Sequence, residues 1–265
     1  MIQPTTRIAF FGGVYSNYLA LERAIDDARR RGADALYCLG DFGAFGPFPD
    51  RAIEILRDAE VICLQGNYDH SIGNGLEDCQ CGYTDPRDNH FAEISYDYTR
   101  RGTSAEHCRW MRELPEQIRL ELGPRRVLLC HGSPRKMNEF LWESTTPTHF
   151  LDKLAGDFEA DLILATHTGI KWQRELAGGR RFVNVGVLGR PENDGRKNVW
   201  YTMLEQSGRS EPCVEFIPVE YDHHRLASEM AGEGLPSEFV ETVLSGWWTT
   251  CLEILPSKER RRGRF

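Results

Sequence analysis

The stretch GDFGAFGPFPD, residues 40–50, follows the apolar run at residues 35–39. A carboxylate directly after a strand-like run, with glycines on either side, is expected at the carboxyl end of a strand. Ligands of open α/β sheets bind at that end. Asp41 alone is weak evidence, because Asp beside Gly is common in ordinary turns.

Three later stretches end strand-like runs in the same manner: GNYDH at residues 66–70, CHGSP at 130–134 and ATHTG at 165–169. Together with the first stretch they offer one Asp, one Asn and two His from four strand ends. Such a set of oxygen and nitrogen donors suits a divalent metal. Taken singly, each of these residues is more often structural than a ligand, so the prediction of a metal site rests on their combination.

Length and charge limit the alternatives. A chain of 265 residues is long enough for one large α/β domain or two small ones. Its formal net charge of −8 argues against general nucleic-acid binding, which needs a basic surface, but permits a small anionic ligand. No apolar run is long enough to span a membrane and no leader pattern is present, so we expect a soluble, cytoplasmic protein without a membrane partner.

Strand-like and helix-like patterns alternate in the first third of the chain, which predicts a largely parallel sheet with crossover helices. The first helix is expected to begin at Asn17, and the second near Pro49. The later part changes to β. Its expected strands are residues 118–122, 126–130, 162–165, 171–176, 182–185, 199–204 and 213–219, with one helix near 148–158. Two sheets packed face to face with helices outside accommodate this count, and two amphipathic helices are expected after residue 222.

Residues 71–102 interrupt this alternation. The segment is rich in Gly, Asp and Asn, carries the pair Cys79 and Cys81, and then offers an aromatic run that favours a helix. A connection this long beside a candidate site favours a lid or pocket wall. A surface excursion with one packed helix is the equally weighted alternative.

The four stretches, in their order, resemble the motifs of the calcineurin-like metallophosphoesterase superfamily, in particular its small bacterial and archaeal phosphodiesterase branch. The resemblance covers residues 7–204 and rests on GDFGAFGPFP, GNYD, CHGSP, and LATHTG followed by FVNVGVLGRP. It implies an α/β/β/α four-layer sandwich of two mixed sheets with metals at the sheet edge. The expected domain spans residues 1–220, with 71–105 as a lid-like insertion and 221–265 as a helical extension packed on it.

Members of that superfamily hold two metals, and the resemblance implies the ligands of each. For the second metal they are Asp41, which would bridge both ions, with Asn67, His131 and His167, all present here.

The first-metal site departs from the family pattern. The opening motif has Gly13 and Tyr15 where the family has Asp and His, and the last motif has Gly169 in place of a His. We therefore expect one divalent transition metal, such as Mn, Fe, Zn or Ni, in an atypical, single-metal centre.

Other residues near the motifs have weaker assignments. In GNYD, Tyr68 stands where the family usually has His; a phenol with an ordinary pKa near 10 is a poor acid at neutral pH, and His70 is a second candidate for the catalytic proton. Tyr15 and the insertion residues Cys79, Cys81 and His90 are candidates to fill the first-metal position. The alternative for the insertion residues is two loop cysteines and a surface His.

Three cations lie near the motifs. Arg135 and Lys136 follow His131, and Arg190 follows the last motif, so each is a candidate to bind an anionic substrate. Solvated surface charges are the alternative reading.

The favoured function is a metal-dependent phosphoesterase-like hydrolase acting on a small phosphomonoester or phosphodiester. The alternatives are a non-hydrolytic metalloenzyme with iron–oxygen or lyase chemistry, because two His and one carboxylate also suit non-haem iron, and a non-catalytic ligand-binding protein. The sequence predicts no oligomeric state.

Overall fold

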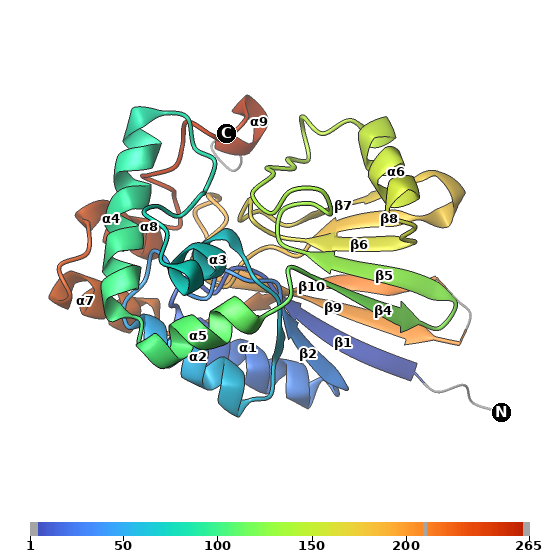
Figure 1. The fold of residues 1–265 in the computed structure, drawn as a ribbon, viewed down its shortest axis with the longest axis horizontal. Helices are drawn as coiled ribbons and strands as arrows, with labels where there is room; N and C mark the ends of the chain where they lie inside the picture. The colour runs from blue at the N-terminus through green and yellow to red at the C-terminus, as the bar shows by residue number, and fades with distance from the viewer. Residues whose placement is uncertain (1–4, 209–210, 262–265) are drawn as a thin grey trace.

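The computed structural model describes residues 5–208 and 211–261, and contains two five-stranded sheets (Figure 1). In the first sheet, three parallel strands are flanked on one side by an antiparallel pair. Its order is β10 (Cys213–Val219), β9 (Val199–Ser207), β1 (Thr5–Phe11), β2 (Ala35–Cys38) and β3 (Ile62–Cys63).

The second sheet has three parallel strands at its centre and one antiparallel strand at each edge. Its order is β4 (Gln117–Leu122), β5 (Arg125–Cys130), β6 (Leu162–Ala165), β8 (Arg181–Asn184) and β7 (Trp172–Glu175). Both sheets are therefore mixed, as predicted.

The sheets face each other across an apolar layer that includes Phe10, Leu129 and Leu164. Because side chains alternate along a strand, the neighbours of these residues point away from this layer and pack against helices. The helices α1 (Tyr18–Arg30) and α2 (Pro49–Asp58) cover the first sheet, and α6 (Thr148–Asp157) covers the second (Figure 1). The four-layer α/β/β/α sandwich is confirmed.

Helix α1 shows why the sequence folds as predicted here. The Asn17 side chain accepts a hydrogen bond from the Ala20 amide at 3.1 Å, which satisfies one of the free amides of the first turn. Leu21, Ala24 and Ile25 lie on its buried face. Arg29 and Arg30 lie in the last turn, where their positive charges interact favourably with the negative end of the helix dipole.

Residues 71–102 are largely helical. The helix α3 (Asn67–Asn74) begins at the end of β3, and α4 (Pro86–Gly102) and α5 (Ala105–Glu113) follow. Figure 1 shows α4 beyond the ends of the strands, beside α8 (Ser237–Ser245). The predicted aromatic helix is α4, whose buried residues include Phe91 and Tyr96.

The chain ends in α7 (His223–Gly232), α8 and the short α9 (Ser257–Arg260), and a 3₁₀ turn, η1 (Ala177–Gly179), precedes β8. Leu226, Met230 and Phe239 of α7 and α8 belong to the same apolar cluster as the buried face of α1. The two helices predicted after residue 222 are thus present, and α9 was not predicted. Within residues 5–208 and 211–261, every helix is too short or too polar to span a bilayer.

Six strands direct their carboxyl ends to one edge of the sandwich. The loops after β1, β2 and β3 come from the first sheet, and those after β5, β6 and β8 come from the second. This edge carries all four sequence stretches that predicted a metal site.

Candidate metal centre

Asp41 is held by a network of backbone hydrogen bonds. The Asp69 carboxylate accepts hydrogen bonds from the amides of Asp41 at 2.6 Å, Phe42 at 3.0 Å and Gly66 at 2.8 Å. The Tyr68 amide donates to Asp41 Oδ1 at 3.1 Å. A Cβ on Gly66 would collide with Asp41 Oδ1, so this close approach needs glycine.

The sequence motifs assigned no role to Asp69, although its carboxylate fixes the loop that carries Asp41. Burial and the nearby Asp41 charge raise the pKa of Asp69 to about 7, even though three amides stabilise its charged form. The signal for it was its position three residues after Gly66, where an acidic side chain closes a capping box at a helix start.

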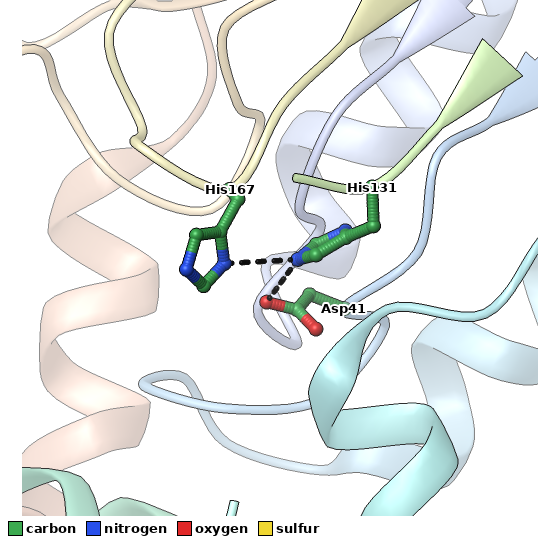
Figure 2. Close-up of side chains that lie close together, drawn as sticks. All are labelled: Asp41, His131 and His167. Carbon is green, nitrogen blue, oxygen red and sulfur yellow. Dashed lines mark hydrogen bonds and ion pairs between the residues drawn. The ribbon is translucent and has the colours of Figure 1, made fainter. Parts of the chain in front are cut away.

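Asp41, His131 and His167 form a buried cluster whose ligand atoms all lie within 4.8 Å of one another (Figure 2). His131 Nε2 lies 3.2 Å from Asp41 Oδ2 and 3.2 Å from His167 Nδ1. Two donors bound tetrahedrally at about 2.1 Å to a Zn²⁺-sized ion are about 3.4 Å apart, close to these spacings. The cluster therefore has the dimensions of one metal site.

His131 is oriented from behind by the backbone. Its Nδ1–H donates to the Leu39 carbonyl at 2.6 Å, which leaves Nε2 free to face the cluster. A metal-binding His is commonly fixed in this way through its other ring nitrogen. Burial lowers the pKa of His131, but the Asp41 carboxylate outweighs it and holds that pKa above its usual value.

His167 is electrostatically different from His131. Burial, and then the charge of His131, lower the pKa of His167 to about 3, so its ring is neutral and can donate a lone pair at neutral pH. Both Asp41 and His167 have left-handed backbones, with φ of 59° and 68°. Such conformations are costly for non-glycine residues and cluster at functional sites.

Asn67 presents its carbonyl oxygen from the start of α3. Its amide group donates to the Cys79 carbonyl at 2.8 Å, while Oδ1 is buried without a hydrogen-bond partner. His167 Nε2 is likewise buried and unpartnered. Buried polar atoms normally have partners, so these two atoms fit a site that binds a further group. The donor set fits a divalent transition metal.

Within the part of the chain that the structure describes, the first-metal side contains no comparable donor set. A Cβ on Gly13 would collide with the Tyr15 ring, and a Cβ on Gly169 would lie 3.3 Å from the Trp248 ring. The buried Tyr15 ring thus packs directly against Gly13. Burial strongly raises the pKa of Tyr15, which disfavours its phenolate.

A pocket with a cavity of about 50 Å³ joins the two sides. This volume exceeds the roughly 10–15 Å³ that one water needs, so there is room for a small group. Residues from both halves of the chain line it, including Tyr15, Asp41, Phe45, Asn67, Tyr68, Cys81, Phe91, His167, Arg190, Phe239 and Cys251. Three of them, Phe45, Phe91 and Phe239, make part of its wall apolar.

The two candidates for the catalytic proton lie differently. Tyr68 lines the pocket, but its hydroxyl donates toward α4, to Ser95 Oγ at 3.2 Å, and burial strongly raises its pKa. His70 points away, and its Nδ1 lies 3.3 Å from Gln65 Oε1. The structure does not bring His70 to the pocket.

The insertion residues do not offer free ligands. Cys79 and Cys81 are joined in a disulfide, so neither is a thiolate that could replace a first-metal ligand. The pair instead contacts Asn67, whose amide nitrogen is 3.4 Å from Cys81 Sγ. His90 is exposed on α4, 5.4 Å from the Phe91 ring, and does not line the pocket.

Of the three candidate anion-binding cations, only Arg190 reaches the pocket. Arg135 is exposed, pairs with Glu139 and lies over the Phe150 ring at 4.6 Å. Lys136 is exposed as well. Arg135 and Lys136 are therefore surface charges, which is the alternative stated for them above.

Fold and cluster together define a two-sheet α/β protein with a metal-ligand set at the carboxyl ends of its strands. The family model of the calcineurin-like phosphoesterase superfamily domain matches residues 7–207. The chain belongs to this superfamily, which uses divalent metals, and membership supports a phosphoesterase-type hydrolase.

Individual relatives agree with this assignment. The chain is 25% identical to a metallophosphoesterase from Sphaerobacter thermophilus, with a TM-score of 0.69 over 92% of this chain and 100% of that one. A hypothetical protein from Pyrococcus horikoshii shares the fold, with a TM-score of 0.76 at 20% identity and the same coverage. An uncharacterized protein of Methanocaldococcus jannaschii is 23% identical over 90% of this chain and 98% of its own length.

Proposed function

We propose that this chain is a phosphoesterase with a single-metal centre at Asp41, Asn67, His131 and His167, acting on a small phosphomonoester or phosphodiester. The observation that carries the proposal is the buried cluster whose ligand atoms lie within 4.8 Å of one another. Asn67 Oδ1, buried without a partner, supports it as the fourth donor.

A divalent metal bound there would act as a Lewis acid toward the phosphoryl group of an ester. The chain itself fixes the donors before any ligand arrives. Leu39 holds the His131 tautomer, and the amide of Tyr68 holds the Asp41 carboxylate. Such prior ordering lowers the cost of reorganisation during the reaction.

We expect slow turnover of generic aryl phosphate esters. Two-metal enzymes stabilise both the attacking and the leaving oxygen of an in-line displacement. Gly13, Tyr15 and Gly169 replace three of the first-metal ligands of the family pattern and leave only the shared Asp41, so we expect half of that stabilisation to be missing. Slow turnover of generic esters would not reveal the preferred substrate, which would instead be sought by screening a set of phosphate esters.

The test combines metal content with activity. The full chain, expressed without a chelating tag, is loaded with Mn²⁺, Fe²⁺, Zn²⁺ or Ni²⁺ and measured by elemental analysis. Hydrolysis of 4-nitrophenyl phosphate and bis(4-nitrophenyl) phosphate is then followed for each form. One metal per chain with slow, metal-dependent hydrolysis is expected, whereas two metals with efficient turnover would contradict a single-metal centre.

One observation favours a second candidate function. Asp41, His131 and His167 make a two-His, one-carboxylate set, which also serves non-haem iron chemistry. Tightly bound iron whose absorption changes with oxygen would favour an oxidative enzyme over a hydrolase. Ligand binding without turnover under every metal would instead favour a non-catalytic binding protein.

A further inference from the structure

Arg190 is a buried cation that lacks an acidic partner. Only 7% of its surface is exposed, and its Nε has no hydrogen-bond partner. Across residues 5–208 and 211–261, no carboxylate forms an ion pair with it. Burying a charge is costly unless it is paired, so an unpaired buried guanidinium beside a pocket indicates a place for an anion.

Arg190 lies on the first-metal side of the pocket. It follows β8 in the loop that also carries Gly189, and it lines the cavity with Asp41, Asn67 and His167. A Cβ on Gly169 would lie 3.6 Å from Arg190 Nη2. The guanidinium therefore stands beside the position where the family pattern has a metal-binding His.

The position of Arg190 is fixed by the C-terminal extension. Its guanidinium lies over the Trp248 ring, 3.5 Å from the ring centroid. Trp248 is itself anchored, because its indole N–H donates to the Pro191 carbonyl at 2.6 Å and its amide donates to Asn193 Oδ1 at 2.9 Å. A cation stacked on a desolvated Trp is attracted by the negative face of the ring, which offsets part of the cost of burial.

The charge on Arg190 persists in this surrounding. Burial lowers the pKa of Arg190, but the sulfur of Cys251 and the hydroxyls of Tyr83 and Tyr15 outweigh it and hold that pKa above its usual value. The guanidinium is thus protonated at neutral pH.

We infer that Arg190 supplies the fixed positive charge that the first metal supplies in the family pattern, and that it binds a phosphoryl oxygen. Trp248 is the positioning residue that holds the guanidinium toward the pocket. A guanidinium suits this task because its planar donors match phosphate oxygens in pairs. The role in ester hydrolysis rests on the proposed function, whereas the binding of an oxyanion does not.

The experiment measures inorganic phosphate binding to the full chain by calorimetry, with metal and without it. Arg190→Met is expected to weaken phosphate binding at least tenfold in both states, with unchanged metal content. Arg190→Lys keeps the charge but loses the paired donors, so it should recover part of the affinity. Arg51→Met is the matched control, since Arg51 stacks on Tyr18 at 3.7 Å but does not line the pocket.

Kinetics give a second readout. If a metal-dependent esterase activity is found, Arg190→Met should raise KM as well as lower kcat, while Trp248→Leu should weaken phosphate binding about threefold. Trp248→Leu carries the test if Arg190→Met does not fold by circular dichroism.

Unchanged phosphate affinity in folded Arg190→Met, or no phosphate binding by the unaltered chain, would overturn the inference. A chain that binds no metal but loses phosphate affinity in Arg190→Met would refute the single-metal proposal and leave Arg190 as the oxyanion site.

Discussion

The two sides of the pocket lie at the same edge of the sandwich but are built in opposite ways. On the second-metal side, Asp41, His131 and His167 converge with ligand atoms within 4.8 Å, and Asn67 keeps an unpartnered oxygen. On the first-metal side, the glycines leave space that aromatic rings occupy. Unpartnered buried polar groups cost about 1–3 kcal/mol each, whereas packed rings stabilise the fold. The first side is therefore a repacked wall, and the second remains suited to binding.

The contrast also concerns charge. The second-metal side presents a carboxylate and two imidazoles, which could hold a metal cation, and the other side presents Arg190, which is itself a cation. Under the two proposals above, the pocket would bind one metal and one anion at adjacent positions. The following variants test each half of that statement.

The largest effect is expected from His131→Ala. His131 lies between Asp41 and His167, at 3.2 Å from each. Without its imidazole the cluster loses one of its three closely spaced donors, so bound metal should be lost. Since even outer-shell changes at metal sites cost 10–100-fold, activity should fall by about a hundredfold or more. Elemental analysis and kcat measure this, with the exposed His149→Ala as control. Full metal content in His131→Ala would show that this cluster is not the metal site.

Asp69→Asn should have the next largest effect. The Asn side chain has one acceptor oxygen instead of two, so it cannot accept hydrogen bonds from all three backbone N–H groups that Asp69 binds. At least one of those N–H groups is then left unpaired. We expect a loss of about 1–3 kcal/mol in the free energy of unfolding and about tenfold weaker metal binding. Urea denaturation and metal titration measure the two effects. The exposed Asp58→Asn is the control, and equal behaviour of both variants would show that Asp69 does not order the Asp41 loop.

Gly169→His restores the family's residue on the first-metal side, yet the bound metal should not increase. The new side chain would meet Trp248 at 3.3 Å, and φ at this position is +80°. Strained backbone of this kind costs about 1–3 kcal/mol. The control is Gly178→His, which has φ of +69° and open space around it. A second metal per chain in Gly169→His alone would show that the wall is not closed.

The smallest effect concerns pH. Burial raises the pKa of Glu139, but hydrogen bonds from Arg135 and Ser133 outweigh it and set that pKa below its usual value. A lowered folded-state pKa contributes stability that is full above about pH 4.3 and is lost as the pH falls through the folded-state pKa. The difference in Tm between the unaltered chain and Glu139→Gln should therefore shrink below that pH. The exposed Glu121→Gln is the control; a difference that grows in acid would contradict the sign.

Much of the fold could be predicted because local signals agreed with it. Asn17 caps the helix that it was expected to cap, and strands 162–165 and 213–219 have the predicted bounds. The order of the strands within each sheet, by contrast, depends on packing between distant segments, which no local pattern encodes.

The closeness of the candidate donors Asp41, His131 and His167 was predictable for the same reason, since each of them follows a strand end. The other side of the pocket was not. Nothing local to Trp248 or Cys251 connects them with Arg190, about 60 residues earlier. Arg135 shows the reverse error, because closeness in sequence to His131 did not bring it to the pocket.

The place of Trp248 in the chain has a consequence for how proteins of this kind are compared and dissected. The family match ends at residue 207, yet Phe239 and Cys251 line the pocket and Trp248 supports its cation. A fragment cut at the family boundary would retain every candidate metal donor and lose Phe239 and Cys251 of the pocket wall and the Trp248 ring that stacks on Arg190. If the proposed function holds, part of the surface that would contact a substrate lies outside the family match, so relatives that share the candidate metal donors need not share the substrate.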